Sequence, residues 1–224
     1  TSCTVASASR PIQAATACAA LTIPSISPVI AQQLGVPASM VGTYIALLYI
    51  GASMAALAGG GVVLRYGAMR LSQACLLVCA AGLLAMVVLG ADVGWLALPA
   101  VAVSALVVGV GYGPITPASS HVLIKTTPRE RMGLTFSIKQ TGVPAGAALA
   151  GAVLPILALQ IGWRGAFALV AAAGILIALI AQIVRAMLDT GRATAHRSSV
   201  ARVIAPLGHV LRTPALAELA GRER

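Results

Sequence analysis

The sequence predicts an all-α membrane protein with six transmembrane helices, arranged as two three-helix repeats. Of the 224 residues, 59% are hydrophobic and only 9% are charged, whereas a soluble domain carries about a quarter charged residues. The apolar residues gather in six runs of near membrane length. Runs such as LVAAAGILIALIAQIV do not alternate apolar and polar residues as barrel strands do, so we expect helices.

Each of the six runs approaches or exceeds the roughly 20 apolar residues that cross the hydrocarbon core as a helix. They cover residues 11–34, 39–63, 71–91, 95–122, 133–160 and 163–187. The segments between them are GVPA, LRYGAMR, ADVGW, LIKTTPRERMG, and IG followed by WRG. The first and fourth runs are the weakest by hydropathy, because prolines and small polar residues interrupt them.

The first run has a second interpretation as a secretory signal, because it contains the small-residue stretch ATACAA. It continues through Pro24 and Pro28 to Leu34, however, and has only Arg10 as a basic flank. We therefore expect it to be a retained span.

Matched interruptions predict the repeat. Pro24 and Pro28 interrupt the first run, and Pro114 and Pro117 interrupt the fourth. Proline frees carbonyl groups in the preceding turn, and at membrane depth these need protein or a water-filled cavity beside them. Paired interruptions of this kind indicate the binding region of a transporter. Ordinary kinks between packed helices are the other explanation.

Basic residues predict the orientation, since they concentrate on the cytoplasmic side of a membrane protein. With six spans, one side receives Arg10, Arg65, Arg70, Lys125, Arg129, Arg131 and every arginine from Arg185 onward. The other side receives Arg164, which with Trp163 is expected to anchor the sixth span at the outer interface. We expect both termini in the cytoplasm and a bacterial-type inner (plasma) membrane.

The sequence divides into a transmembrane bundle, residues 1–188, and a basic segment, residues 189–224, that reads as a cytoplasmic tail or the start of a central loop. The net charge of +10 lies in this segment and in the short links, so it indicates topology and anionic lipid rather than nucleic acid.

Enzyme chemistry and metal binding find no support in the residue pattern. We see no P-loop, no nucleophile with a base partner and no cluster of ligating residues. The cysteines show neither metal-ligand spacing nor a disulfide framework: Cys3, Cys18, Cys75 and Cys79. We expect no cofactor and no metal.

Lys139 is the leading candidate for a binding residue. It shares one helical stripe with Thr135, Gly142, Gly146 and Ala150, and small residues four apart mark a face of close helix approach. An intramembrane charge on such a face indicates a functional site, and no acid lies in any span to neutralise it. An anionic substrate is the expected partner. A side chain that reaches back to the interface is the alternative.

Further candidates surround this lysine in the sequence or lie in the interrupted fourth run. Gln140 adjoins Lys139, and Tyr112 lies in the interrupted part of the fourth run. Ser119, Ser120 and His121 follow toward the cytoplasmic end. A satisfied polar contact is the other explanation for His121.

GGGVVLRYGAMR, residues 59–70, resembles the signature loop of the major facilitator superfamily. On that match Gly60 and Gly67 are the loop glycines, Arg65 and Arg70 its basic residues, and Tyr66 its aromatic residue. TTPRERMG and GWRGAF are also similar to segments of that family. Family members usually have two six-helix halves with an alternating-access cavity between them, and this chain resembles the N-terminal half.

The resemblance implies secondary active transport, by alternating access, of a small anionic solute, with a coupling ion where transport is coupled. It also implies a C-terminal six-helix half as partner, so we expect a fragment, a truncated product or a half that dimerises. A non-transporting truncated or regulatory membrane fragment is the alternative.

Departures from the family pattern limit this expectation. Leu64 replaces the acidic residue of the loop, and the fourth run lacks the arginine that proton-coupled relatives carry. In the fifth run Gly142 and Gly146 fit the antiporter signature but Pro144 is out of register. Proton antiport is therefore not expected, and SIKQTGVPAG is closer to permeases for small anions, including cyanate-type permeases.

Overall fold

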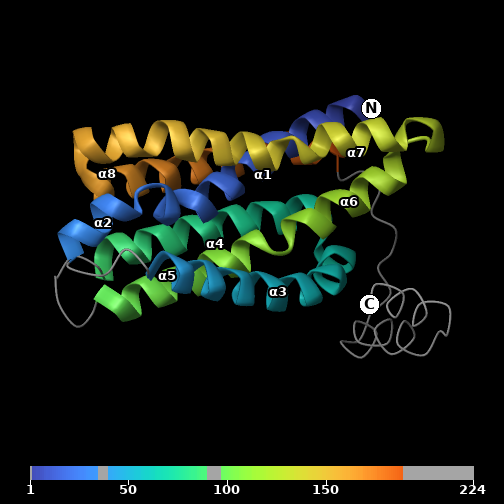
Figure 1. The fold of residues 1–224 in the computed structure, drawn as a ribbon. Coiled ribbons are helices and arrows are strands. Elements are labelled where there is room, and N and C mark those ends of the chain that lie inside the picture. Colours follow the sequence, from blue (N-terminus) through green and yellow to red (C-terminus); the bar gives the residue numbers. More distant parts are fainter. Residues whose placement is uncertain (1, 35–39, 90–96, 189–224) are drawn as a thin grey trace, which may run out of the picture.

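A computed structural model of the chain describes residues 2–34, 40–89 and 97–188 (Figure 1). Within these ranges all regular structure is helical. The elements are α1 (Ser2–Ser25), α2 (Ser27–Leu34), α3 (Met40–Tyr66), α4 (Ala68–Leu89), α5 (Ala97–Tyr112), α6 (Ile115–Thr126), the 3-10 turn η1 (Arg129–Arg131), α7 (Met132–Gln140) and α8 (Gly142–Leu188). The predicted tail, residues 189–224, lies outside the described residues, so its boundary stays a prediction.

Helix α8 makes two passes along the bundle. Gly162 has φ 75° and ψ 164°, a backbone conformation that costs little only for glycine. Figure 1 shows the chain reversing direction at the end of the first pass and returning beside it. The predicted break at IG before Trp163 therefore coincides with the turn.

Four stretches of the described chain are long and apolar enough to cross a membrane: Val41–Val63, Ala68–Leu89, Leu98–Ser120 and Arg129–Ile183. The last is 55 residues long and contains the reversal at Gly162. The predicted first span is not among them; in the structure it is divided at Ile26 into α1 and α2. Over the residues that it describes, the structure thus confirms a helical fold with helices long and apolar enough to cross a membrane. Six spans in two repeats remain a prediction.

Two predicted links are shorter than the sequence suggested. LRYGAMR is mostly helical: α3 runs to Tyr66, α4 begins at Ala68, and only Gly67, with φ 87°, lies between them. A single left-handed glycine is enough to redirect the chain. Similarly, α6 continues to Thr126 inside the link LIKTTPRERMG. The predicted fifth span, by contrast, has a turn at Thr141 between α7 and α8.

Both proline-containing runs are interrupted where the sequence predicts. Ile26 separates α1 from α2, and residues 113–114 separate α5 from α6. Pro28 has no N–H to donate to the carbonyl of Pro24. The Ser27 hydroxyl donates to that carbonyl instead, at 3.0 Å. The local polar side chain thus satisfies a carbonyl that the prolines leave free.

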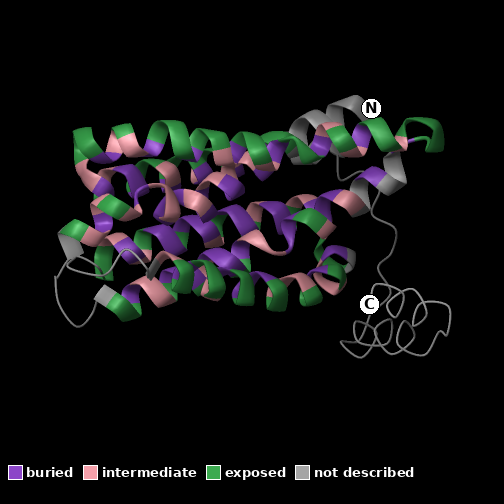
Figure 2. Ribbon diagram, in the orientation of Figure 1, coloured by how far each residue is buried: buried purple, intermediate pink, exposed green. Residues whose placement is uncertain are grey.

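Close helix packing holds the bundle together. α1 packs along α8, and α5 lies between α3 and α4; the buried residues follow these seams (Figure 2). A methyl group added to Gly109 or Gly113 would overlap the carbonyl oxygens of Leu48 or Ala52. Small residues therefore let the backbones approach closely, as expected where lipid offers no hydrophobic drive between helices.

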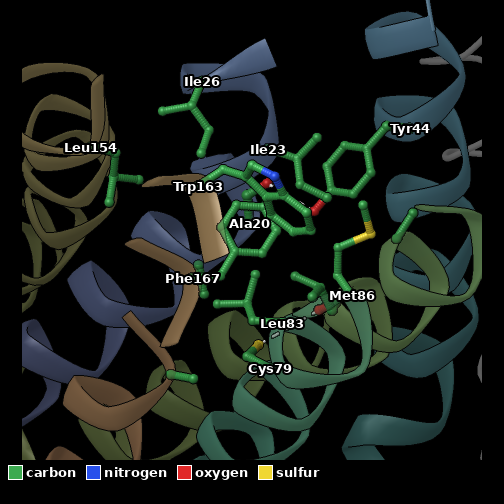
Figure 3. Close-up of a cluster of buried hydrophobic side chains, with 14 of the residues drawn as sticks. Ala20, Ile23, Ile26, Tyr44, Cys79, Leu83, Met86, Leu154, Trp163 and Phe167 are labelled. Carbon is green, nitrogen blue, oxygen red and sulfur yellow. Dashed lines mark hydrogen bonds between the residues drawn. The ribbon is translucent and has the colours of Figure 1, made fainter. Parts of the chain in front are cut away.

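An apolar cluster fills the end of the bundle that contains the Gly162 turn (Figure 3). Trp163 and Phe167 meet edge to face, with ring centroids 5.5 Å apart, and pack with Leu83, Met86 and Tyr44. The prediction that Trp163 anchors an interface is wrong, because its ring is buried. The exposed Arg164 lies over that ring, with its guanidinium carbon 5.2 Å from the centroid.

Candidate functional site

Lys139 lies in the last turn of α7, and its side chain is 1% exposed. Its Nζ donates to Ser120 Oγ at 2.8 Å and to the carbonyl oxygen of Thr116 at 3.3 Å. The ring of Phe136 also faces the ammonium, 5.6 Å from centroid to Nζ, within the range of cation–π attraction. The side chain therefore turns into the bundle and ties α7 to α6.

The stripe that the sequence predicts around Lys139 is a packing face. Thr135, Lys139, Gly142, Gly146 and Ala150 are all buried. The expectation that Lys139 faces the bundle is confirmed, because its side chain is buried and contacts α6. Helix α1 forms the other side of this seam: a methyl group on Gly146 would overlap the carbonyl oxygen of Ala14.

The described surroundings of Lys139 hold no negative charge. In residues 2–34, 40–89 and 97–188 the only acid is Glu130, which is exposed in η1. The partners of the ammonium are a hydroxyl, a carbonyl and an aromatic face, all neutral. A buried charge with neutral partners keeps much of its desolvation cost, so an anion entering this place would gain a strong charge-assisted hydrogen bond.

Two adjacent serines of α6 accept hydrogen bonds from two different helices, α1 and α7. Ser120 Oγ donates its own hydrogen to the carbonyl of Thr116 at 2.9 Å, which leaves its lone pairs for Lys139. Ser119 Oγ donates to the carbonyl of Ile115 at 2.8 Å. Adjacent residues are about 100° apart on a helix, so Ser120 faces α7 while Ser119 faces α1.

Gln13 in α1 completes this polar group, and the sequence prediction missed it. Its side chain is 1% exposed, and its Nε2 donates to Ser119 Oγ at 3.5 Å. Its Oε1 has no hydrogen-bond partner. An amide in an otherwise small and apolar stretch, PIQAATACAA, was the signal available in the sequence. We call Gln13, Ser119, Ser120 and Lys139 the polar junction.

A cavity of about 170 Å³ lies beside the polar junction and includes two predicted residues, Pro24 and Tyr112. Its other lining residues come mainly from α1 and α3: Ala17, Ala20, Leu21, Ile45, Leu48, Tyr49 and Val143. Ala17 follows Gln13 by four residues and Val143 follows Lys139 by four. Gln13 therefore lies about one helical turn from the cavity along α1, and Lys139 lies just before the turn at Thr141 that precedes Val143.

Other predicted residues do not join this group. Gln140 is exposed and points away from the face that carries Lys139. Pro28 is exposed, whereas Pro114 is buried against Gly59. Pro117 is half-buried in the first turn of α6. The side chain of His121 lies outside the described part of the structure.

The segment that resembles a signature loop lies at the junction of α3 and α4. Arg65 and Arg70 are exposed, and the Arg65 guanidinium stacks over Tyr66 at 5.1 Å. Gly67 makes the turn, whereas a methyl group at Gly60 would meet open space. The glycine that packing requires is Gly59, where a methyl carbon would lie 3.1 Å from Cβ of Pro114.

The three cysteines whose side chains the structure describes have free thiols. Cys75 and Cys79 are buried and Cys18 is half-buried; Cys79 Sγ lies 3.6 Å from the carbonyl oxygen of Val108. No group of three ligating side chains that would hold a metal ion occurs in the ranges that the structure covers. These thiols act as small packing groups.

Comparison with known proteins supplies the family. A family model described as the Major Facilitator Superfamily matches residues 13–220, which include the polar junction, the cavity and the α3–α4 turn. No curated protein matches the chain.

Proposed function

This chain belongs to the Major Facilitator Superfamily, a family of membrane transporters, and on that premise we propose that it carries a small anion by secondary active transport. The anion binds at Lys139. One observation supports this proposal: the Lys139 side chain is fully buried, and the described partners of its ammonium are all neutral. A charge that faces the interior of a membrane bundle indicates a functional site, such as a substrate or ion pathway.

We propose six spans in two three-helix units. The first unit comprises α1 with α2, then α3 and α4, and the second comprises α5 with α6, then the two passes that include α7 and α8. The first helix of each unit is broken, at Ile26 in one and at residues 113–114 in the other, which supports the correspondence. The six proposed spans correspond to one half of a twelve-helix transporter of this family.

Binding at Lys139 requires movement, because the side chain is covered in this conformation. Helix α6 follows the break at residues 113–114, and α7 is bounded by η1 and the turn at Thr141. Both acceptors of the Lys139 ammonium lie on α6. A shift of α6 about the break would therefore expose the ammonium, as alternating access demands.

The basic residues support a cytoplasmic location for the end of the bundle that carries the α3–α4 turn and η1. Arg65, Arg70, Arg129 and Arg131 lie at this end, and all four are exposed. An inner-membrane protein with cytoplasmic termini satisfies the charge rule.

Anion binding by the full-length protein tests the proposal. Cyanate, nitrate, sulfate, hydrogen phosphate, lactate and propionate would each be titrated while thermal unfolding is followed, since a ligand of the folded state raises its apparent stability. At least one anion should raise the melting temperature, and the same anion should be taken up by proteoliposomes. Lys139→Gln should abolish both effects.

Lys125→Gln is the matched control, because it removes the only other lysine and should leave binding and uptake intact. Lys139→Arg keeps the charge and should retain part of the binding. Equal binding and uptake by wild type and Lys139→Gln would overturn the assignment of Lys139. A protein that binds and moves none of these anions would point to the non-transporting alternative.

A further inference from the structure

Gln13 carries the one buried side-chain oxygen of the polar junction without a donor. The residue is 1% exposed, and Oε1 lacks a partner although it is shielded from solvent. A carbonyl oxygen in that state is costly unless something donates to it. A polar group that is buried but unsatisfied is a candidate ligand contact.

The hydrogen bonds of Ser119 determine which end of the Gln13 amide is free. Ser119 Oγ donates its hydrogen to backbone carbonyls of α6, at 2.8 Å to Ile115 and 3.1 Å to Thr116. Its oxygen can therefore act toward Gln13 only as an acceptor, which selects the NH₂ end of the amide. The free atom of Gln13 is its acceptor, not a donor.

That acceptor lies on the same seam as Lys139. A methyl carbon on Gly142 would lie 3.4 Å from Gln13 Oε1, and Gly142 follows Lys139 by three residues, less than one helical turn. Gln13 also contacts Ser119, the neighbour of the serine that binds Lys139. The junction thus carries a cationic donor, bound to Ser120, and an unpaired neutral acceptor, on the amide bound to the adjacent Ser119.

We propose that Gln13 is a specificity-determining residue that selects anions carrying a hydrogen-bond donor, such as a hydroxycarboxylate or a hydrogen oxyanion. This inference rests on the proposed function of Lys139. The ammonium binds the negative oxygen of the ligand, and Gln13 Oε1 accepts from its hydroxyl. An anion without a donor pairs with Lys139 but leaves Oε1 unsatisfied, so it binds more weakly.

Two matched pairs of anions test this selectivity in the full-length protein. Lactate differs from propionate by a hydroxyl, and hydrogen phosphate differs from sulfate by a donor. Dissociation constants would be taken from the ligand dependence of thermal unfolding. In at least one pair the wild type should bind the donor-bearing member about tenfold or more tightly, in line with sites that hydrogen-bond a substrate hydroxyl.

Gln13→Met keeps the approximate shape of the side chain but removes the acceptor. The ratio of the two dissociation constants within a pair should therefore fall close to one, while propionate or sulfate still binds. Gln160→Met changes an exposed glutamine of α8 and should leave the ratio unchanged. If Gln13→Met fails to fold, Ser119→Ala serves instead. It removes the contact that orients the amide and should lower the ratio several-fold.

The outcomes separate this inference from the proposed function. Equal binding of the two anions within both pairs would overturn the role of Gln13. So would an unchanged ratio of dissociation constants in Gln13→Met or, if that variant does not fold, in Ser119→Ala. The transport proposal would still stand if Lys139→Gln abolished binding. If the wild type binds none of these anions, both the transport proposal and the role of Gln13 are overturned.

Discussion

The hydroxyl of Tyr44 donates to the carbonyl oxygen of Ala20 at 3.4 Å, joining α3 to α1 beside the break in the first predicted span. Pro24 has no N–H to donate to that carbonyl. Tyr44 is 1% exposed and lies in the apolar cluster, with its hydroxyl directed toward α1 (Figure 3). A residue from a neighbouring helix thus supplies the donor that the helix itself cannot.

Tyr44→Phe should destabilise the protein by about 1 kcal/mol, the usual net contribution of one buried hydrogen bond. The ring is kept, so packing changes little and the lost donor accounts for the effect. Thermal or denaturant unfolding in detergent measures it. Tyr49→Phe is the control, because Tyr49 is 57% exposed; equal effects of the two changes would contradict the role of Tyr44.

Gly146→Ala should destabilise the protein by roughly 1–3 kcal/mol, the range for overpacking a tight contact. The added methyl would overlap the carbonyl oxygen of Ala14, and backbone cannot move aside as a flexible side chain does. Gly151→Ala is the matched control on the same helix, since a methyl there meets nothing within 4 Å. That variant should be neutral or gain up to about 1 kcal/mol of helix propensity.

Lys139→Met should raise stability in the absence of anions while abolishing anion binding. Methionine fills similar space without a buried charge, and replacing buried charges by apolar groups is often stabilising, here by about 1 kcal/mol or more. Unfolding without ligand and ligand-dependent unfolding measure the two effects separately. A large loss of stability would show that Lys139 has a structural role between α6 and α7 instead.

Cysteine labelling should place the two ends of the bundle on opposite sides of the membrane. The exposed Tyr66 adjoins the α3–α4 turn, and the exposed Gln160 adjoins the reversal at Gly162. In full-length protein freed of its four native cysteines, Tyr66→Cys should react with an impermeant maleimide only from the cytoplasmic face. Gln160→Cys should react only from the outer face. Labelling of both from one side would refute the proposed orientation.

Composition and periodicity were enough to predict much of this structure. An apolar chain in lipid must pair its own backbone groups, so helices followed from hydropathy alone. The spacing of Lys139 with Gly142 and Gly146 predicted a packing face, and all three residues are buried. Helical periodicity is a local property, so it can be read without knowing which helix lies opposite.

The partners of these residues were beyond the reach of the sequence. Gln13 and Ser119 are 106 residues apart, and Tyr44 and Ala20 lie in separate helices. Such contacts depend on which helices are neighbours and how they are rotated. The misplaced links have a related cause: hydropathy marks the polar residues of LRYGAMR, whereas the helix ends there are set by the one glycine that adopts a positive φ.

The amino-acid sequence thus determined that the chain lies in a membrane, that it forms helices, where prolines break them and that Lys139 faces inward. Each of these features depends on composition or on spacing within one helix. The tertiary structure alone decided that Lys139 meets only neutral acceptors in the described chain, that Gln13 keeps an unpaired oxygen, and that Trp163 belongs to the core. These depend on distances between helices, which arise only when the helices pack.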